Sequence, residues 1–236
     1  MHEIIAQVRE KQAQARLSRN KGDALRKANR EHDARIAYEA GVLQLSESAE
    51  LLSDYRSQLK TLTAPLSSDL TEAVSELAEI CGALGGLYQR LGLLDKALAS
   101  YTEGAGLEEH FELPETYNRL NAIKYALLTG TQRLSDLTPK IRALADLIDS
   151  NIRSHTSLGD SGWALADLAD CLALLGRTDE AAQTYAKFVA KAETKSPERA
   201  LEVLVEIAAK LRASGDPEAA RVETAIDILK ANLVRR

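Results

Sequence analysis

The side chains that could carry chemistry in this chain are few and far apart. Its histidines lack the spacing of metal ligands; they are His2, His32, His110 and His155. His110 has glutamates around it in the segment GLEEHFELPE, where a solvated helix end is a simpler interpretation than a ligand site. The sequence predicts no metal site and no cofactor.

The carboxylates and the serines give no catalytic arrangement either. Asp160, Asp167 and Asp170 form an acidic strip near Trp163, and paired carboxylates can act as general acid and base when they are buried together. This strip falls on an ordinary amphipathic helix, which favours exposed carboxylates. No serine lies in a nucleophile-elbow context, and no glycine-rich loop follows a strand. We therefore predict a protein that is not an enzyme.

The two cysteines, Cys81 and Cys171, lie in apolar helical stretches and have no CxxC partner. This arrangement is typical of reduced, buried thiols. The first residues, MHEIIAQVREKQ, lack the apolar run of a signal peptide, and no apolar stretch reaches the length that crosses a bilayer. These features predict a cytoplasmic protein without a membrane partner.

The composition favours helices. Hydrophobic residues make up 45% and charged residues 28% of the chain, whereas aromatic residues make up only 4% and there are five prolines. Alanine, leucine, glutamate, arginine and lysine lose little rotamer freedom in a helix. The residues that suit strands are too thinly spread to build a sheet. The expected fold class is all-α.

The charge is acidic as a whole but uneven. The net charge of −5 gives no general argument for nucleic acid as a partner, although residues 1–60 carry 11 Lys and Arg against 9 Asp and Glu. A solvated helix face is the simplest interpretation of this excess, and an RNA or anionic-membrane patch is the alternative. No aromatic platform for stacking bases lies among the basic residues, which are Arg16, Arg19, Lys21, Arg26, Lys27, Arg30 and Arg35.

Prolines and glycines divide the second part of the chain into helices. Four prolines stand where a helix would begin, and three of them follow a residue suited to N-capping, as Thr138 precedes Pro139. Four glycines close apolar-periodic runs. These marks predict antiparallel helices with short connections, over about 67–91, 94–108, 114–129, 138–155, 161–175, 178–193, 197–214 and 217–233.

The N-terminal part has a different pattern, with a break near Gly22 and no proline before the linker that follows it. We expect one helix over about 1–19 and a long one over about 23–60. The apolar stripe of the long helix docks on the rest of the protein or pairs with another chain. The predicted domains are an N-terminal helical hairpin over 1–62 and a helical repeat domain over 67–236. The stripe consists of Tyr38, Val42, Leu45, Ala49, Leu52, Tyr55 and Leu59.

Three segments share one internal spacing. In each, the motif residues of a first helix recur at steps of three, four and seven and so fall on one face, and a glycine ends that helix. A small residue in the first helix and an alanine in the second let the two helices approach closely. The three sets are Leu84, Gly85, Gly92 and Ala97; Leu168, Ala169, Gly176 and Ala181; and Ile207, Ala208, Gly215 and Ala220. The segment Ala34-x3-Tyr38-x2-Gly41 parallels Ala97-x3-Tyr101-x2-Gly104 and indicates a remnant pair at the N-terminus.

This pattern resembles the tetratricopeptide repeat (TPR), whose signature is W-x2-L-G-x2-Y followed by A-x3-F and then P. The match is strongest at 81–101, where Leu84, Gly85, Tyr88, Ala97 and Tyr101 fall in place. The other copies are degenerate, and the turn glycines stand farther apart than the family's usual spacing. The resemblance covers roughly residues 70–236 and implies antiparallel helix pairs stacked as an α-solenoid.

A narrower resemblance involves residues 116–130 and 161–185, which are similar to the TPR-type region called the TRAF-binding domain. That region is found in apoptosis signal-regulating kinases and in bacterial signalling or defence proteins. The matching features are a helix that bears asparagines and, one helix pair later, a Trp-Ala-Leu helix that ends at its own glycine. The resemblance implies a regulatory scaffold that couples a partner effector to a signal.

The TPR resemblance also implies a groove lined by the first helix of each pair, in which a protein or peptide partner binds. A lone tryptophan beside amides and carboxylates suits peptide recognition; the alternative for Trp163 is a plug between neighbouring helix pairs. The predicted groove residues are Glu79, Gln89, Asn118, Asn121, Lys124, Trp163 and Asp170.

The sequence favours a protein–protein interaction scaffold or adaptor, which binds a peptide, a partner domain or, through the N-terminal helices, a copy of itself. One alternative is a regulator that senses a peptide or a small ligand in the groove. A second alternative is RNA binding through the basic 16–35 segment.

Overall fold

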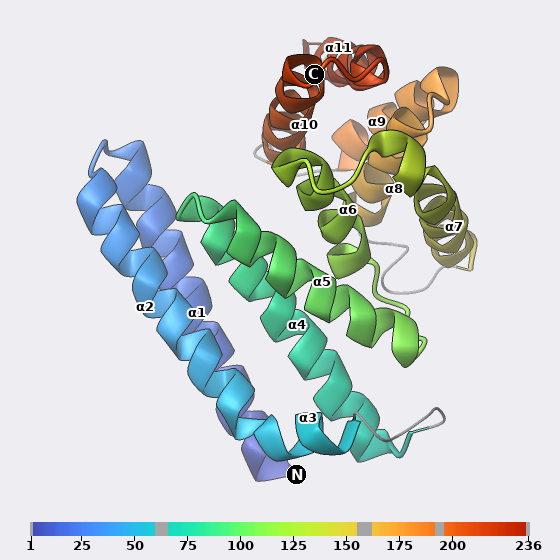
Figure 1. Ribbon diagram of the computed structural model, residues 1–236. Coiled ribbons are helices and arrows are strands. Elements are labelled where there is room, and N and C mark those ends of the chain that lie inside the picture. The colour runs from blue at the N-terminus through green and yellow to red at the C-terminus, as the bar shows by residue number, and fades with distance from the viewer. Residues whose placement is uncertain (1, 60–65, 155–161, 192–195, 235–236) are drawn as a thin grey trace. The chain divides into compact units, whose positions relative to one another are not determined.

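The computed structural model describes residues 2–59, 66–154, 162–191 and 196–234; of residues 196–200 only the backbone is described. The chain forms two compact units, Met1–Ala122 and Ile123–Arg236. The described residues of both units are helices and turns without a strand (Figure 1). The predicted all-α fold class is therefore confirmed. No helix in the described part of the chain is long and apolar enough to span a membrane.

The first unit begins with a helical hairpin, and the division between the units falls within α6. The helices of the first unit are α1 (His2–Lys27), α2 (Glu31–Leu51), α3 (Ser53–Leu59), α4 (Ser68–Arg90), α5 (Leu94–His110) and the start of α6 (Tyr117–Thr129). The second unit holds the rest of α6 together with α7 (Leu134–Arg153), α8 (Gly162–Leu174), α9 (Thr178–Lys191), α10 (Ser196–Ala213) and α11 (Ala219–Val234).

Within each unit, consecutive helices pack as pairs. The closest pairs are α1 with α2, α4 with α5, α8 with α9, and α10 with α11. The pairs also stack: α2 lies against α4 in the first unit, and α11 lies against α8 and α9 in the second. This stacking of helix pairs within a unit is the packing of an α-solenoid. In the second unit, α7 also lies against α8.

The α4–α5 pair has the predicted motif contacts. A Cβ atom added to Gly85 would lie 2.6 Å from the Tyr101 ring, so glycine is required where the two helices approach. Ala97 is fully buried in the same crossing. Gly92 has a φ of +73° in the turn between the helices, where a left-handed residue ends α4.

The α1–α2 pair repeats this arrangement. A Cβ atom added to Gly22 would lie 2.3 Å from the Tyr38 ring, so this glycine permits close packing and does not break the helix. The predicted break near Gly22 is therefore wrong: α1 continues to Lys27, and the turn forms around Asn29, whose φ is +58°. Asparagine tolerates the left-handed conformation better than most residues. The two helices of the predicted remnant pair therefore do pack against each other; that this pair is a remnant of the repeat stays a prediction.

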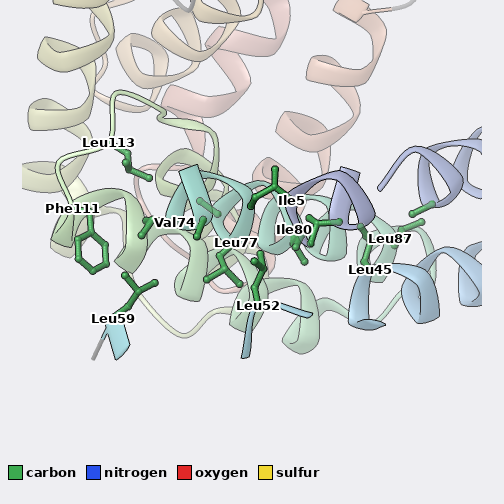
Figure 2. Close-up of a cluster of buried hydrophobic side chains, with 14 of the residues drawn as sticks. Ile5, Leu45, Leu52, Leu59, Val74, Leu77, Ile80, Leu87, Phe111 and Leu113 are labelled. Carbon is green, nitrogen blue, oxygen red and sulfur yellow. The ribbon is translucent and has the colours of Figure 1, made fainter. Parts of the chain in front are cut away.

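The apolar stripe of α2 docks inside the first unit, as one of the two sequence interpretations expected. Tyr38, Leu45 and Leu52 belong to a buried cluster with side chains of α4. Figure 2 shows Leu45 and Leu52 among Ile5 of α1 and residues of α4; the α4 residues labelled there are Val74, Leu77, Ile80 and Leu87. The predicted domain boundary between 62 and 67 falls mostly on residues outside the described ranges and stays a prediction.

The start of α7 differs from the prediction. α7 begins at Leu134, and Pro139 lies inside it. Thr138, expected to cap the helix, instead donates a hydrogen bond to the carbonyl of Leu134 at 3.1 Å. The earlier start buries Leu134, Leu137 and Ile141 on one face, and this burial outweighs the one intrahelical hydrogen bond that proline removes so close to the N-terminus.

The third copy of the motif also departs from the prediction. Ala220 is exposed, so it does not lie at a close helix crossing. The cause is a longer turn after Gly215, in which the Glu218 amide donates to Asp216 Oδ1 at 2.9 Å, so that α11 begins at Ala219. α11 therefore buries Val222, Ala225 and Leu229.

Candidate functional site

The predicted groove residues fall in both units. Glu79, Gln89, Asn118 and Asn121 belong to the first unit, whereas Lys124, Trp163 and Asp170 belong to the second. The structure brings Lys124 and Asp170 together as a buried ion pair. Each unit therefore has its own set of candidate residues.

The Lys124–Asp170 pair lies in the interior of the second unit. The Tyr185 hydroxyl donates a second hydrogen bond to Asp170, at 2.6 Å from Oδ1. Asp170 is only 1% exposed, so the expectation that this carboxylate is solvated is wrong. A buried carboxylate is stable here because a cation and a hydroxyl donor satisfy both of its oxygens.

Asp167 lies on the same helix as Asp170 and is a second acidic group near Lys124. Burial raises the pKa of Asp167 to about 7, with Lys124 lowering it and Asp170 raising it further. Burial alone would lower the pKa of Lys124, but Asp170 and Asp167 reverse this effect and raise it. The lysine therefore stays protonated and is not an amine nucleophile. Asp160, the remaining member of the predicted acidic strip, lies outside the described residues.

Neither cysteine has the surroundings of a reactive thiol. Both are free and buried, and burial raises the pKa of Cys81 to about 12 and that of Cys171 further still. Thiolate formation is suppressed at neutral pH. No group of His, Cys, Asp or Glu side chains among the described residues could hold a metal ion.

Asn118 acts as a polar wedge in the first unit. It is 2% exposed, and its amide group donates to the carbonyl of Ala78 at 2.9 Å and to Glu108 Oε1 at 2.7 Å. Gly104 leaves room for it, since a Cβ atom there would lie 2.4 Å from Asn118 Cγ. Burial raises the pKa of Glu108 to about 7, against the lowering effect of the donors from Asn118 and Arg119.

Trp163 is the predicted groove residue that remains most available for a large apolar contact. Its side chain is 49% exposed at the start of α8, and its ring centroid lies 6.0 Å from that of Phe188. The remaining predicted residues lie at the surface or half-buried: Glu79 is exposed and 3.6 Å from Arg16, Asn121 donates to the carbonyl of Tyr117, and Gln89 is half-buried.

One site feature was missed from the sequence. In α1–α2, the Tyr38 hydroxyl donates to Asp23 at 2.9 Å, and Arg90 donates to the same carboxylate at 2.8 Å. The Tyr185–Asp170–Lys124 set has the same chemistry. The signal was present for these two tyrosines, because Asp23 and Asp170 stand fifteen residues before Tyr38 and Tyr185 and each follows a small residue, Gly22 or Ala169.

Several cations of the basic segment 16–35, and the neighbouring Arg90 of α4, form ion pairs with carboxylates. Arg26 lies 3.3 Å from Glu31, Arg30 lies 2.7 Å from Asp33, Arg35 lies 2.9 Å from Glu39, and Arg90 lies 2.8 Å from Asp23. A hollow lined by Arg26, Arg35, Arg90 and His32 therefore includes cations that already have carboxylate partners. This arrangement does not favour binding of a polyanion.

Comparisons with known proteins agree with the repeat motif that the sequence shows at residues 81–101. The tetratricopeptide-repeat family model matches residues 78–111, the segment that contains the Gly85–Tyr101 contact. These residues are a tetratricopeptide repeat. The chain is a TPR-like protein, as its sequence predicted, and the repeat supports a general role in protein–protein interaction.

Two solved structures are similar at low identity. The crystal structure of BtubC (BKLC) from P. vanneervenii is 17% identical, with 97% of this chain and 91% of that chain covered and a TM-score of 0.35. The structure described as the TPR2AB-domain:pHSP90-complex of yeast Sti1 is 16% identical in sequence, and the match covers 92% of this chain and 99% of that chain with a TM-score of 0.18. No curated protein matches this chain.

Proposed function

We propose that this chain is a non-enzymatic scaffold or adaptor that binds a protein or peptide partner, with a regulatory role in a cytoplasmic signalling or defence system. The repeat at 78–111 supports the interaction role, because stacked helix pairs present extended surfaces without a need for chemistry. The resemblance of residues 116–130 and 161–185 to the TRAF-binding region supports the signalling role. Free, buried cysteines suit a reducing compartment.

The exposure of Trp163 is the observation that carries this proposal. α8 is otherwise buried almost throughout, yet its single tryptophan, Trp163, is half exposed. Tryptophan is enriched among the residues that dominate binding energy at protein interfaces. We therefore place the partner-binding surface of the second unit around Trp163.

For the buried groove residues Lys124, Asp170 and Asn118 we propose a supporting role without direct contact with the partner. Lys124 and Asp170 support the α8 backbone that carries Trp163, since their ion pair is fully internal. Asn118 does the same for α4 and α5 in the first unit. Direct contact with a partner is proposed for Trp163 and for the more accessible Glu79, Gln89 and Asn121.

Capture of binding partners from the source cells tests the proposal. The purified full chain is immobilised, and the proteins retained by the wild type, by Trp163→Ala and by Val205→Ala are compared. Val205 is a matched control because it is an exposed apolar residue of the same unit. We expect a partner that binds the wild type and the control but binds Trp163→Ala at least about tenfold more weakly when it is purified and titrated. If the wild type and both variants retained the same proteins, the placement of the binding surface at Trp163 would be overturned.

Sensing of a small ligand and binding of RNA remain as alternatives to the scaffold. A sensor would bind a small peptide or metabolite extracted with the protein, which mass spectrometry of the denatured chain would detect. RNA binding through the 16–35 segment would fall steeply with salt, and a filter-binding series measures this. The ion pairs of Arg26, Arg30 and Arg35 favour the scaffold over RNA binding.

A further inference from the structure

The outer surface of the N-terminal hairpin carries large apolar side chains that the fold leaves uncovered. Ile36 and Leu43 of α2 are 52% and 61% exposed, and Leu17 of α1 is 69% exposed. Ser18 contacts Gln44, with 3.1 Å between their side-chain oxygens, so Leu17 and Leu43 lie at about the same level of the hairpin. Exposed apolar residues that gather on one element are typical of an interaction surface.

The residues of this surface have a symmetric spacing along α2. His32, Ile36, Leu43 and Glu47 follow one another at steps of four, seven and four residues, and all four are exposed. Steps of four and seven return to one face of a helix. The arrangement reads the same in both directions about its centre, which falls between Glu39 and Ala40, both of them exposed.

We propose that two copies of this chain pair through this face, with their α2 helices antiparallel. Ile36 of each copy then packs against Leu43 of the other, and His32 of each copy meets Glu47 of the other. Each contact occurs twice, as a twofold interface requires. At the centre, Ala40 of each copy faces Glu39 of the other, whose carboxylate is already paired with Arg35 of its own helix at 2.9 Å.

The charge of the hairpin favours a second copy in this orientation. Residues 16–35, next to the turn, carry seven Lys and Arg against three Asp and Glu, whereas residues 36–59 carry one against four. Antiparallel pairing places the basic end of one hairpin on the acidic end of the other, and parallel pairing would place like charges together. Glu47 also pairs with Lys11 but keeps a side-chain exposure of 48%, so it remains accessible to a second cation.

This inference names a partner that the proposed function leaves open, and it does not depend on Trp163. The surface lies wholly on α1 and α2 of the first unit. Trp163→Ala is expected to leave the oligomeric state unchanged. Failure of one proposal is therefore distinguishable from failure of the other.

The molar mass in solution gives the first test. Light scattering of the full chain at about 50 µM should give twice the chain mass of 25.7 kDa. Leu43→Glu should weaken the dimer by about 30-fold or more, because it places a charge at the centre of an apolar contact. The matched control is Val205→Glu, which replaces an exposed apolar residue of the second unit and should remain dimeric. A wild-type chain that is monomeric, or a Leu43→Glu chain as dimeric as the control, would overturn the inference.

Disulfide cross-linking tests the register independently of any weakening substitution. Chains with Ile36→Cys and chains with Leu43→Cys should form a cross-link when they are mixed and mildly oxidised. Either variant alone should not, because two copies of the same position lie about 10 Å apart along the helices. The native cysteines are buried and give little background. Cross-links within a single variant, or none in the mixture, would contradict the antiparallel arrangement.

Discussion

Lys124 keeps its charge inside the second unit because the chain surrounds it with acidic groups. Asp170 accepts from Lys124 and from Tyr185, and Asp167 adds a further carboxyl on the same helix. An ion pair of this kind adds little to stability as a whole, but removal of one partner leaves a buried charge without compensation. The pair therefore fixes how α6 and α8 of this unit meet.

Lys124→Met is expected to destabilise the second unit by about 3–5 kcal/mol, because Asp170 would remain buried without its cation. Unfolding by denaturant, followed through the fluorescence of the single tryptophan, Trp163, measures this change within the second unit. Lys140→Met is the control, since Lys140 is exposed on α7 and should change stability by less than about 0.5 kcal/mol. A loss below about 1 kcal/mol for Lys124→Met would show that the ion pair is not internal.

The stability of the second unit should also depend on pH through Asp167. Its pKa is raised to about 7 in the folded chain, from an ordinary value of 3.8, so the folded state holds a proton that the unfolded state releases. The contribution of Asp167 to the free energy of unfolding is fully present below about pH 4. It is lost as the pH rises through 7, with a slope of at most about 1.4 kcal/mol per pH unit.

Asp167→Asn should remove this contribution, since an amide does not titrate. The free energy of unfolding, measured at intervals from pH 4.5 to 8, should fall less steeply with pH in the variant than in the wild type. Lys124 and Asp170 remain in both chains, so the difference reports Asp167. Parallel curves would mean that Asp167 titrates normally in the fold.

Several site residues could be selected from the sequence, but whether they are buried in the fold could not be predicted from it. Lys124 and Asp170 stood out as polar residues on predicted helices, and an exposed position was the natural interpretation of each alone. Their burial depends on a contact across 46 residues of sequence, which no local pattern reveals. Trp163 differs, because its exposure leaves it available as the sequence had suggested.

At the level of helix pairs, small residues decide how closely the helices approach. Gly22 lies against the ring of Tyr38, Gly85 lies against that of Tyr101, and Gly104 lies against Asn118. In each case an added Cβ atom would come closer than 3 Å to its neighbour. These glycines are therefore required by packing, although glycine lowers intrinsic helix stability.

Gly85→Ala should destabilise the first unit by about 1–3 kcal/mol, because the new methyl group overlaps the Tyr101 ring. Gly106→Ala is the matched control on α5, where an added Cβ atom meets nothing within 4 Å. Helix propensity predicts that this second change stabilises the helix by up to about 1 kcal/mol. Thermal and denaturant unfolding followed by circular dichroism distinguish the two. Equal effects would mean that the helices do not meet closely at Gly85.

Most helices could be predicted because proline, glycine and apolar periodicity mark their ends, as they do for α4, α5 and α9. The exceptions have tertiary causes. α7 starts early because burial of Leu134 outweighs the effect of Pro139, and α11 starts late because Asp216 organises a longer turn. Gly22 appeared to break a helix because its packing partner, Tyr38, lies sixteen residues away in the next helix.

For the whole molecule, the sequence indicated stacked helix pairs and a role in protein interaction. The all-helical fold and the repeat at 78–111 agree with that expectation. The division into units at residue 122 had no sequence signal, because it falls within the continuous helix α6. The identity of a partner depends on surface side chains such as Trp163, Ile36 and Leu43, whose exposure becomes clear only in the folded chain.

The central claim is that this chain binds another protein through Trp163, and the tryptophan itself reports on it. With 5-fluorotryptophan at its single tryptophan position, the chain gives one tryptophan ¹⁹F signal, which can be followed as a captured, unlabelled partner is added. Burial of the half-exposed ring should shift this signal in a saturable way, with the same affinity as that measured by titration calorimetry. A signal that stays unchanged when the partner is fully bound would contradict the account.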